Sequence, residues 1–231
     1  LFVANAAFRP NPAGGVHAFC HALPGRWHQM AVILSASSCI DWAVRLLGLP
    51  DAAALFALVE GAGGSGDDAG GGELFLPYLS GERTPHNDPD ACGVLFGLNH
   101  DSGPARIAAA VLEGVAFAFR DGLDALSDAG TRIDQAMVIG GGARSRLWGR
   151  ILASALGIRL VYREGGDVGP AYGAARLARI GIDGVSVEAA APAPAVAHVV
   201  EPDAVLVERF APRIARYRAL YRQLSPLLGN A

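Results

Sequence analysis

Lysine is missing from this 231-residue sequence, whose 19 positively charged side chains are all arginine. The absence excludes two kinds of site from the chain. A Walker-type phosphate loop needs a lysine ammonium group beside the nucleotide phosphates, and a Schiff-base enzyme needs a lysine amine as its nucleophile. Both mechanisms depend on the ammonium or amine group itself, which a guanidinium does not supply.

Cysteine is scarce, and long apolar runs are absent. Cys20, Cys39 and Cys92 are an odd number without paired spacing, which favours neither a disulfide framework nor a zinc site and indicates a reducing compartment. No apolar run reaches membrane-spanning length and no signal-peptide pattern opens the chain, so we expect a cytoplasmic protein without a membrane partner. A net charge of −3 leaves no basic field for nucleic acid. Small molecules are therefore the expected ligands.

The segment 135–157 is the part around which the sequence is organised. An apolar run there ends at Gly140, Gly141 and Gly142, after which apolar residues recur at helical spacing. This pattern predicts a buried strand, a tight turn and a helix that Ser145 caps with its hydroxyl. Because the three glycines lack side chains, the backbone can take positive φ there and lie flat against a nucleotide. The same glycines would also allow strand and helix to pack closely, and that interpretation stays open.

The order of the predicted elements indicates an α/β protein. With 52% hydrophobic residues the chain can bury a substantial core. Three strands precede the first helix, with the first two strands expected to form a hairpin, and the second half alternates helices and strands. A β-β-β-α-β-α-β-α order is typical of a ribonuclease-H-like lobe, a mixed sheet with helices on both faces. Such a lobe is half of a two-lobed ATPase of the actin, hexokinase and Hsp70 type.

The chain is expected to divide into three parts. Residues 1–183 form the predicted lobe, and residues 184–202, rich in alanine and proline, are expected to be an extended connector. Residues 203–231 carry an apolar stripe at helical spacing, which predicts an extra C-terminal helix packed on the lobe. Residues 61–72 are rich in glycine and are expected to form a mobile loop. Because Leu1 is not methionine and already has strand character, we expect a piece of a longer protein without its N-terminal lobe.

Two further groups of polar residues are candidate site residues. His17, His21 and His28 could bind a metal, but the first two share one face of a strand and no acidic ligand lies close in sequence. A structural role is favoured for them, and we expect no metal site. Glu82 and Arg83 lie in a charged, proline-interrupted loop, where they could serve a site or only hold the loop by ion pairs.

Five parts of the sequence together resemble the C-terminal domain of the FGGY carbohydrate kinases, and among these the xylulokinases. They occur in the family's order and cover nearly the whole chain. The segments are 21–30 (HALPGRWHQM), 76–87 (LPYLSGERTPHN), 93–98 with 110–115 (GVLFGL and AVLEGV), 139–145 (IGGGARS) and 165–176 (GGDVGPAYGAAR).

The resemblance implies an ATP site on this chain. Gly140, Gly141 and Gly142 would lie against the adenosine, with Ser145 near the base. Mg²⁺ would be held mainly through the ATP phosphates and the other lobe. The implied reaction is phosphorylation of D-xylulose to D-xylulose 5-phosphate by the intact protein, with another sugar or a polyol as the alternative acceptor.

The resemblance also implies that Gly81, Glu82 and Arg83 face the cleft between the two lobes. The aspartate general base, the first phosphate loop and most sugar contacts belong to the N-terminal lobe in similar proteins. The second phosphate loop would lie immediately before Leu1. We therefore expect no catalytic residue in this chain and no activity from the chain alone.

The sequence departs from the family pattern at three positions. Arg106 stands where an acidic, amide or histidine side chain is usual, which leaves the local helix start open. Arg150 and Ser154 stand where glutamine and aspartate are usual, which leaves open whether the helix after the glycine turn contacts the base.

Two other functions remain as alternatives from the sequence. A Rossmann methyltransferase or dehydrogenase also meets its cofactor at a glycine turn, but that turn normally follows the first strand, whereas three strands precede it here. A regulatory protein could keep the two-lobed fold and bind nucleotide without turnover. The expected partners are ATP, a small sugar and the protein's own N-terminal lobe, and a homodimer stays open.

Overall fold

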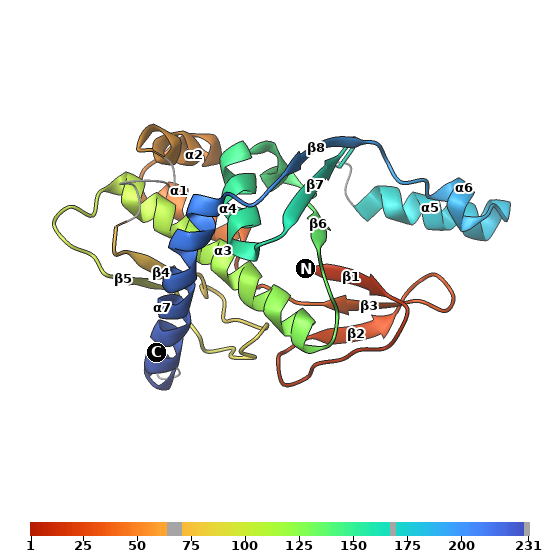
Figure 1. Cartoon of the computed structure of the whole chain (residues 1–231), viewed down its shortest axis with the longest axis horizontal. Coiled ribbons are helices and arrows are strands. Elements are labelled where there is room, and N and C mark those ends of the chain that lie inside the picture. The colour runs from red at the N-terminus through yellow and green to blue at the C-terminus, as the bar shows by residue number, and fades with distance from the viewer. Residues whose placement is uncertain (64–70, 167–169, 229–231) are drawn as a thin grey trace.

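The computed structural model describes residues 1–63, 71–166 and 170–228 (Figure 1). Its helical elements are α1 (Ser37–Leu46), α2 (Ala52–Gly61), α3 (Pro104–Asp128), the 3-10 turn η1 (Gly141–Arg144), α4 (Arg146–Leu156), α5 (Pro170–Asp183), α6 (Val187–Ala190) and α7 (Ala204–Leu228). Its strands are β1 (Phe2–Asn5), β2 (His17–Cys20), β3 (Trp27–Met30), β4 (Leu74–Leu76), β5 (Val94–Phe96), β6 (Gln135–Met137), β7 (Arg159–Arg163) and β8 (Val196–Val200). Most of the expected glycine-rich loop at 61–72 lies outside the described residues. None of the helices in the described ranges combines the length and the hydropathy that a membrane crossing requires.

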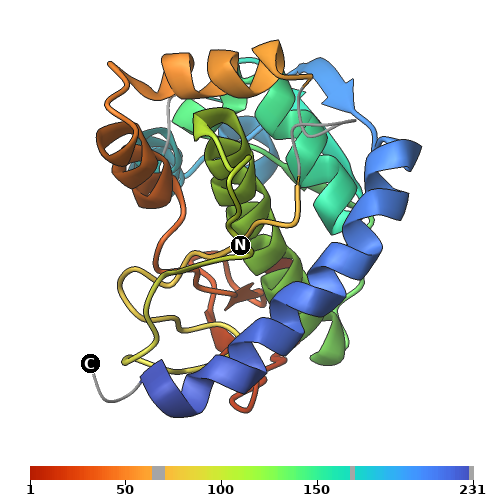
Figure 2. The same cartoon turned by 90° about the vertical axis from the view of Figure 1, so that its left-hand side faces the viewer.

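The long helix α3 runs through the middle of the protein (Figure 2). Pro104 occupies its first position, where the missing backbone N–H has no helical partner to lose, and apolar residues then recur at helical spacing. Residues 108–118 are all buried. Gly114 allows β4 to approach closely, because a Cβ there would lie 2.2 Å from the carbonyl oxygen of Phe75. The core therefore forms where α2, α4 and β4 pack on α3.

The first sheet has the strand order β1-β3-β2, so the predicted hairpin between the first two strands is wrong. Phe2 of β1 and His17 of β2 both lie opposite Met30 of the central strand β3. The reason lies in the connections. A tight turn containing Gly25, with φ of 68°, joins β2 to β3, whereas the stretch between β1 and β2 is too long to act as such a turn.

A second sheet contains β6, β7 and β8, with β6 parallel and β8 antiparallel to β7. The expected connector at 184–202 thus includes α6 and the strand β8, and is not extended chain alone. The described residues do not form the single mixed sheet expected from the sequence. Among them β1 pairs only with β3 and β6 only with β7, so the two three-stranded sheets are separate. Within the described ranges, β4 and β5 pair only with each other, and α5 and α6 stand away from the core (Figure 1).

The C-terminal helix α7 packs across α3 and β4 (Figure 2). Pro212 lies inside α7 without ending it. The next residue, Arg213, is buried, and its guanidinium donates to Oε2 of Glu113 at 2.8 Å. It also donates to the carbonyl oxygens of Gly71 and Glu73 at 2.8 and 2.7 Å. One arginine thus joins three segments that are distant in the sequence.

Arg106, where the sequence departs from the family pattern, has a structural partner. Its Nη2 lies 3.0 Å from Oε1 of Glu73, a carboxylate that is 1% exposed. Its Nη1 also donates to the carbonyl oxygen of Asp101 at 3.2 Å. The arginine therefore fixes the start of α3 against the segment that leads into β4.

Candidate functional site

The glycine turn after β6 lies open at the surface. Gly140 has φ of 85°, a conformation that favours glycine, and η1 begins at Gly141. A Cβ on Gly140 or Gly141 would meet no atom within 4 Å, whereas one on Gly142 would lie 3.3 Å from the ring of Trp148. The turn thus presents an uncrowded stretch of backbone on which a flat ligand can lie.

Ser145 caps α4, as the sequence predicts. Its Oγ accepts a hydrogen bond from the backbone N–H of Trp148 at 3.1 Å. The first turn of α4 begins at Arg146, four residues after the last glycine of the turn, and the helix dipole makes this end electropositive. A hollow of about 390 Å³ lies beside this helix start. It is lined by Glu60, Gly63, Arg146, Leu147 and Arg150.

Arg150 and Ser154, the other two departures from the family pattern, bind the residue immediately before α7. Nε of Arg150 lies 3.1 Å from Oδ2 of Asp203, and the backbone N–H of Asp203 donates to Oγ of Ser154 at 3.0 Å. The Asp203 side chain in turn accepts from the N–H groups of Val205 and Leu206. Both departures therefore join α4 to α7, a role that requires no contact with a ligand.

Only Arg83 of the predicted trio Gly81, Glu82 and Arg83 is exposed. Gly81 has φ of 72°, and a Cβ there would lie 2.6 Å from the carbonyl oxygen of Pro89. Glu82 is 1% exposed, and its Oε1 accepts from the N–H groups of Leu34 and Arg83 at 3.0 and 2.8 Å. The loop is thus built into the interior, and it presents one guanidinium outward.

The three histidines of the first sheet contact neighbouring side chains. Nε2 of His17 lies 3.1 Å from Nη1 of Arg83, and Nδ1 of His21 accepts a backbone N–H. His28 stacks on Phe2 with 4.6 Å between the ring centroids. Within the described ranges, no group of three or more histidine, cysteine, aspartate or glutamate side chains is placed to hold a metal ion. These contacts agree with the structural role favoured for the histidines.

The two predicted groups occupy separate places. Among the described residues, no hydrogen bond or ion pair joins the loop Gly81–Arg83 to the glycine turn. The turn offers backbone for a flat ligand, and the loop offers a positive charge.

Comparison with known proteins identifies the family. The model of the C-terminal domain of the FGGY family of carbohydrate kinases matches residues 4–182. The chain belongs to this family. It is 48% identical over 237 residues to the xylulose kinase of Escherichia coli (strain K12), an alignment that covers 99% of this chain and 46% of that protein.

Solved structures give the same result for the FGGY domain. A "xyloylose kinase" from Brucella ovis has a TM-score of 0.89 at 44% identity, covering 98% of this chain and 46% of that chain. A xylulose kinase from Rhodospirillum rubrum has a TM-score of 0.79 at 28% identity, covering 98% of this chain and 45% of that chain. These likenesses confirm the predicted C-terminal FGGY domain and its fold class. The chain spans a little under half the length of these relatives.

The sequence does not indicate the side chains by which α7 holds the loop that carries Gly81, Glu82 and Arg83. Tyr221 donates from its hydroxyl to Oδ2 of Asp88 at 2.7 Å, and its ring stacks on His86 at a centroid distance of 3.7 Å. The hydroxyls of Tyr217 and Tyr78 lie 2.8 Å apart. The helical spacing of Tyr217 and Tyr221 indicates a buried stripe, but no sequence signal links them to a loop 133 positions earlier.

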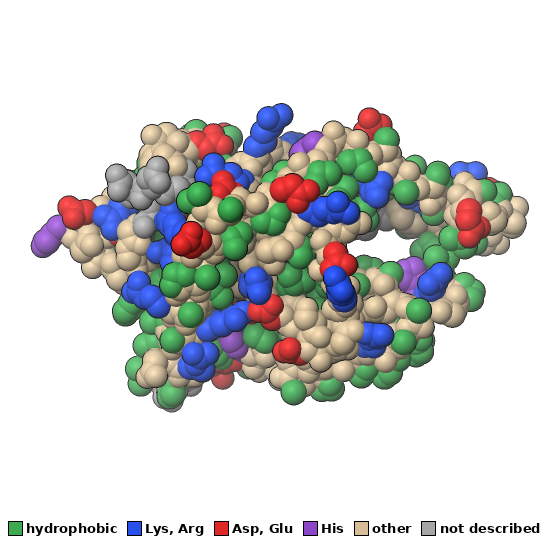
Figure 3. All heavy atoms as spheres, in the orientation of Figure 1, with side chains coloured by type: hydrophobic (Ala, Val, Ile, Leu, Met, Phe, Trp, Pro, Cys, Tyr) green, Lys and Arg blue, Asp and Glu red, His purple; other side chains and the backbone are tan. Residues whose placement is uncertain are grey.

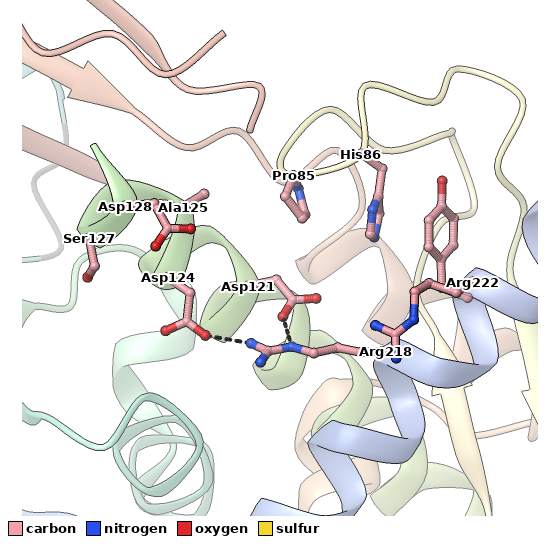
Figure 4. A pocket seen from close by; sticks show the side chains of 10 residues that line it. Pro85, His86, Asp121, Asp124, Ala125, Ser127, Asp128, Arg218 and Arg222 are labelled. Carbon is pink, nitrogen blue, oxygen red and sulfur yellow. Dashed lines mark hydrogen bonds and ion pairs between the residues drawn. The ribbon is translucent and has the colours of Figure 1, made fainter. Parts of the chain in front are cut away.

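A hollow of about 550 Å³ lies between the end of α3 and α7 (Figure 4). Arg218 crosses it, with Nε 2.6 Å from Oδ1 of Asp121 and Nη2 2.5 Å from Oδ2 of Asp124. Burial raises the pKa of Asp121, and the charge of Arg218 opposes that shift. None of the site residues predicted from the sequence lines this hollow, and its central charges pair with each other.

Glu82 is a buried acid in the loop that also carries Gly81 and Arg83. Burial raises its pKa to about 7, the two backbone donors oppose the shift, and the negative charge of Asp121 adds to it. Its Oε2 has no hydrogen-bond partner in the described part of the chain. A proton on this oxygen therefore removes a buried charge that the two backbone donors stabilise only in part.

Glu82→Gln is expected to reduce the pH dependence of stability. The folded pKa of about 7 exceeds the ordinary value of 4.5, so the folded protein holds a proton that the unfolded chain releases. The free energy of unfolding should therefore fall as the pH rises from about 4.5 to about 7, and then level off. Glutamine keeps Oε1 as an acceptor and removes the titration.

Urea unfolding at pH 5 and at pH 8 measures this effect. The wild type should lose more stability between the two pH values than Glu82→Gln does. Glu201→Gln, at an exposed glutamate, is the matched control and should lose as much as the wild type. Equal losses in Glu82→Gln and the wild type would show that Glu82 has an ordinary pKa.

Proposed function

We propose that the full-length protein is a xylulokinase-like sugar kinase that transfers the γ-phosphoryl group of MgATP to the 5-hydroxyl of D-xylulose. The observation that carries the proposal is the 48% identity to a xylulose kinase over 99% of this chain. In the reaction, the sugar oxygen bonds to the γ-phosphorus, and the bond from that phosphorus to the bridging oxygen of ADP breaks. The hydroxyl proton passes to a general base in the other lobe.

This chain supplies the nucleotide side of the proposed site. The open backbone at Gly140, Gly141 and Gly142 takes the face of the adenosine, and Ser145 lies near the base. Support comes from the empty space around Gly140 and Gly141 and from the exposed start of the following helix. Mg²⁺ is bound mainly through the ATP phosphates and the other lobe.

The second lobe of the kinase is the main macromolecular partner in this proposal. Phe2, Phe8 and Phe19 are 59%, 53% and 47% exposed, and α5 carries further exposed apolar residues. Hydrophobic side chains gather beside the gap between the first sheet and α5 (Figure 3). Apolar surface of this kind is typical of an interface. We place the enzyme in the cytoplasm, with ATP and the sugar as ligands and no nucleic acid or membrane partner.

Catalytic efficiencies of the full-length protein with different acceptors test the proposed substrate. We expect the catalytic efficiency with D-xylulose to be higher than with D-ribulose, L-ribulose, L-fuculose or glycerol. A sugar that leaves one buried polar group of the site unpaired loses about 1–3 kcal/mol, roughly 5- to 150-fold in relative rate. If glycerol or L-fuculose has a higher catalytic efficiency than D-xylulose, the proposed substrate is wrong, although the family assignment is unaffected. If no acceptor is phosphorylated, the kinase proposal itself fails.

A further inference from the structure

Arg83 is an exposed residue within a buried segment. Its neighbours Glu82 and Thr84 are 1% and 0% exposed. The buried backbone on both sides fixes where the Arg83 side chain leaves the protein surface. The position therefore differs from that of an arginine on the outer face of a helix, where a long side chain samples many places.

The main chain of Arg83 is held on several sides. Its N–H donates to Oε1 of Glu82 at 2.8 Å, and its carbonyl oxygen accepts from the N–H of Asn87 at 2.6 Å. Gly15 packs against the same carbonyl so closely that a Cβ there would lie 2.7 Å from the oxygen. The stack of Tyr221 on His86 holds the far side of the loop. Little backbone entropy is left to lose when Arg83 binds a ligand.

The charge of Arg83 has no acidic partner in the described part of the chain. The adjacent carboxylate, that of Glu82, faces inward and accepts the N–H groups of Leu34 and Arg83. The only side-chain contact described for the guanidinium is from Nη1 to Nε2 of His17 at 3.1 Å. A neutral histidine can accept this hydrogen bond and orient the guanidinium without cancelling its charge. Nε and Nη2 remain available as donors.

The guanidinium lies at the end of the first sheet where β1 begins. His17 is paired with Met30, and Met30 is paired with Phe2. The ring of His17 stacks with that of Phe19 at 5.7 Å, and both Phe2 and Phe19 are largely exposed. Arg83 thus borders the uncovered aromatic face of the sheet, where a ligand or the other lobe can approach.

We propose that Arg83 binds a phosphoryl group of the substrate or product in the full-length enzyme. A guanidinium matches two phosphoryl oxygens with two parallel N–H donors, and this contact is strong because both partners are charged. The inference rests on the proposed kinase function, since the nucleotide or the sugar phosphate supplies the group. A carboxylate of the other lobe would satisfy the same charge, and the experiment below distinguishes it.

Calorimetric binding to the full-length protein tests the proposal with three probes: ADP, D-xylulose 5-phosphate and adenosine. Arg83→Gln should weaken binding of ADP or of the sugar phosphate about 10- to 100-fold, because a charged hydrogen-bonded pair is lost. Adenosine, which has no phosphate, should bind unchanged. Arg83→Lys should recover part of the loss, since it keeps the charge without the paired donors. The probe whose binding is weakened by Arg83→Gln identifies which phosphate Arg83 holds.

Arg132→Gln is the matched control, because Arg132 is exposed and its one ion pair among the described residues is with the exposed Asp134. It should leave all three affinities unchanged, and its melting temperature should match that of Arg83→Gln. Unchanged binding of ADP and sugar phosphate in Arg83→Gln overturns the proposal in favour of a contact with the other lobe. An equal loss for adenosine and ADP indicates a structural role and also overturns it. These affinities do not depend on turnover, so a wild type that binds phosphates but lacks activity refutes the proposed function alone.

Discussion

Gly141→Val in the full-length protein is expected to raise the Michaelis constant for ATP roughly 5- to 150-fold and to leave that for D-xylulose nearly unchanged. The valine side chain would occupy the space in which we place the adenosine, and such overpacking costs about 1–3 kcal/mol. The fold should tolerate the change. Gly141 is not among the glycines with positive φ, and a Cβ there meets no protein atom within 4 Å.

Gly103→Val is the matched control for this experiment. Gly103 precedes α3 with φ of −85°, which valine adopts, and a Cβ there also meets nothing within 4 Å. The control should keep the wild-type Michaelis constants. If a well-folded Gly141→Val enzyme has an unaltered constant for ATP, the glycine turn is not part of the nucleotide site.

The glycine turn is the part of the site whose local structure follows from the sequence. An apolar run, three glycines and a serine allow few local structures, so the strand, the turn and the Ser145 cap could be predicted. The expected burial of the strand is wrong, because β6 lies at the edge of its sheet and Met137 and Ile139 are 63% and 62% exposed. The orientation of the loop at Gly81–Arg83 could not. Which side chain faces inward depends on Leu34 and on α7, which are remote in the sequence, and charge pattern alone made Glu82 and Arg83 equivalent.

Strand pairing also depends on contacts between residues that are remote in the sequence. The existence of β1, β2 and β3 follows from apolar runs between turn residues, but their order depends on which strand occupies the centre of the sheet. The sequence does not predict β8, because its residues, Val-Ala-His-Val-Val, follow an alanine- and proline-rich stretch typical of a connector. Its place beside β7 comes from a tertiary contact that composition does not encode.

The three departures from the family pattern acquire a physical explanation only from the structure. Arg106 pairs with Glu73, while Arg150 and Ser154 bind Asp203. All three join helices or strands to one another, so substitution at these positions can preserve the fold with different contacts. The sequence could identify the departures but not these roles.

The chain alone is expected to show no sugar-dependent ATP turnover. Phosphoryl transfer depends on placing the base, both phosphate-binding loops and the two substrates together, and small misplacements cost large factors in rate. This chain spans about 46% of the length of a xylulose kinase, and the resemblance places the base in the other part. Closure of two lobes would assemble the site. Nucleotide should also bind weakly to the chain alone, because only the adenosine contacts are present.

A coupled assay of ADP release, run with and without D-xylulose on residues 1–231 and on the full-length protein, tests this account most directly. D-xylulose-dependent turnover is expected from the full-length protein, and none above background from residues 1–231. Sugar-dependent turnover by residues 1–231 alone would contradict the division of the site between two lobes. Absence of turnover by the folded full-length protein would contradict the kinase function itself.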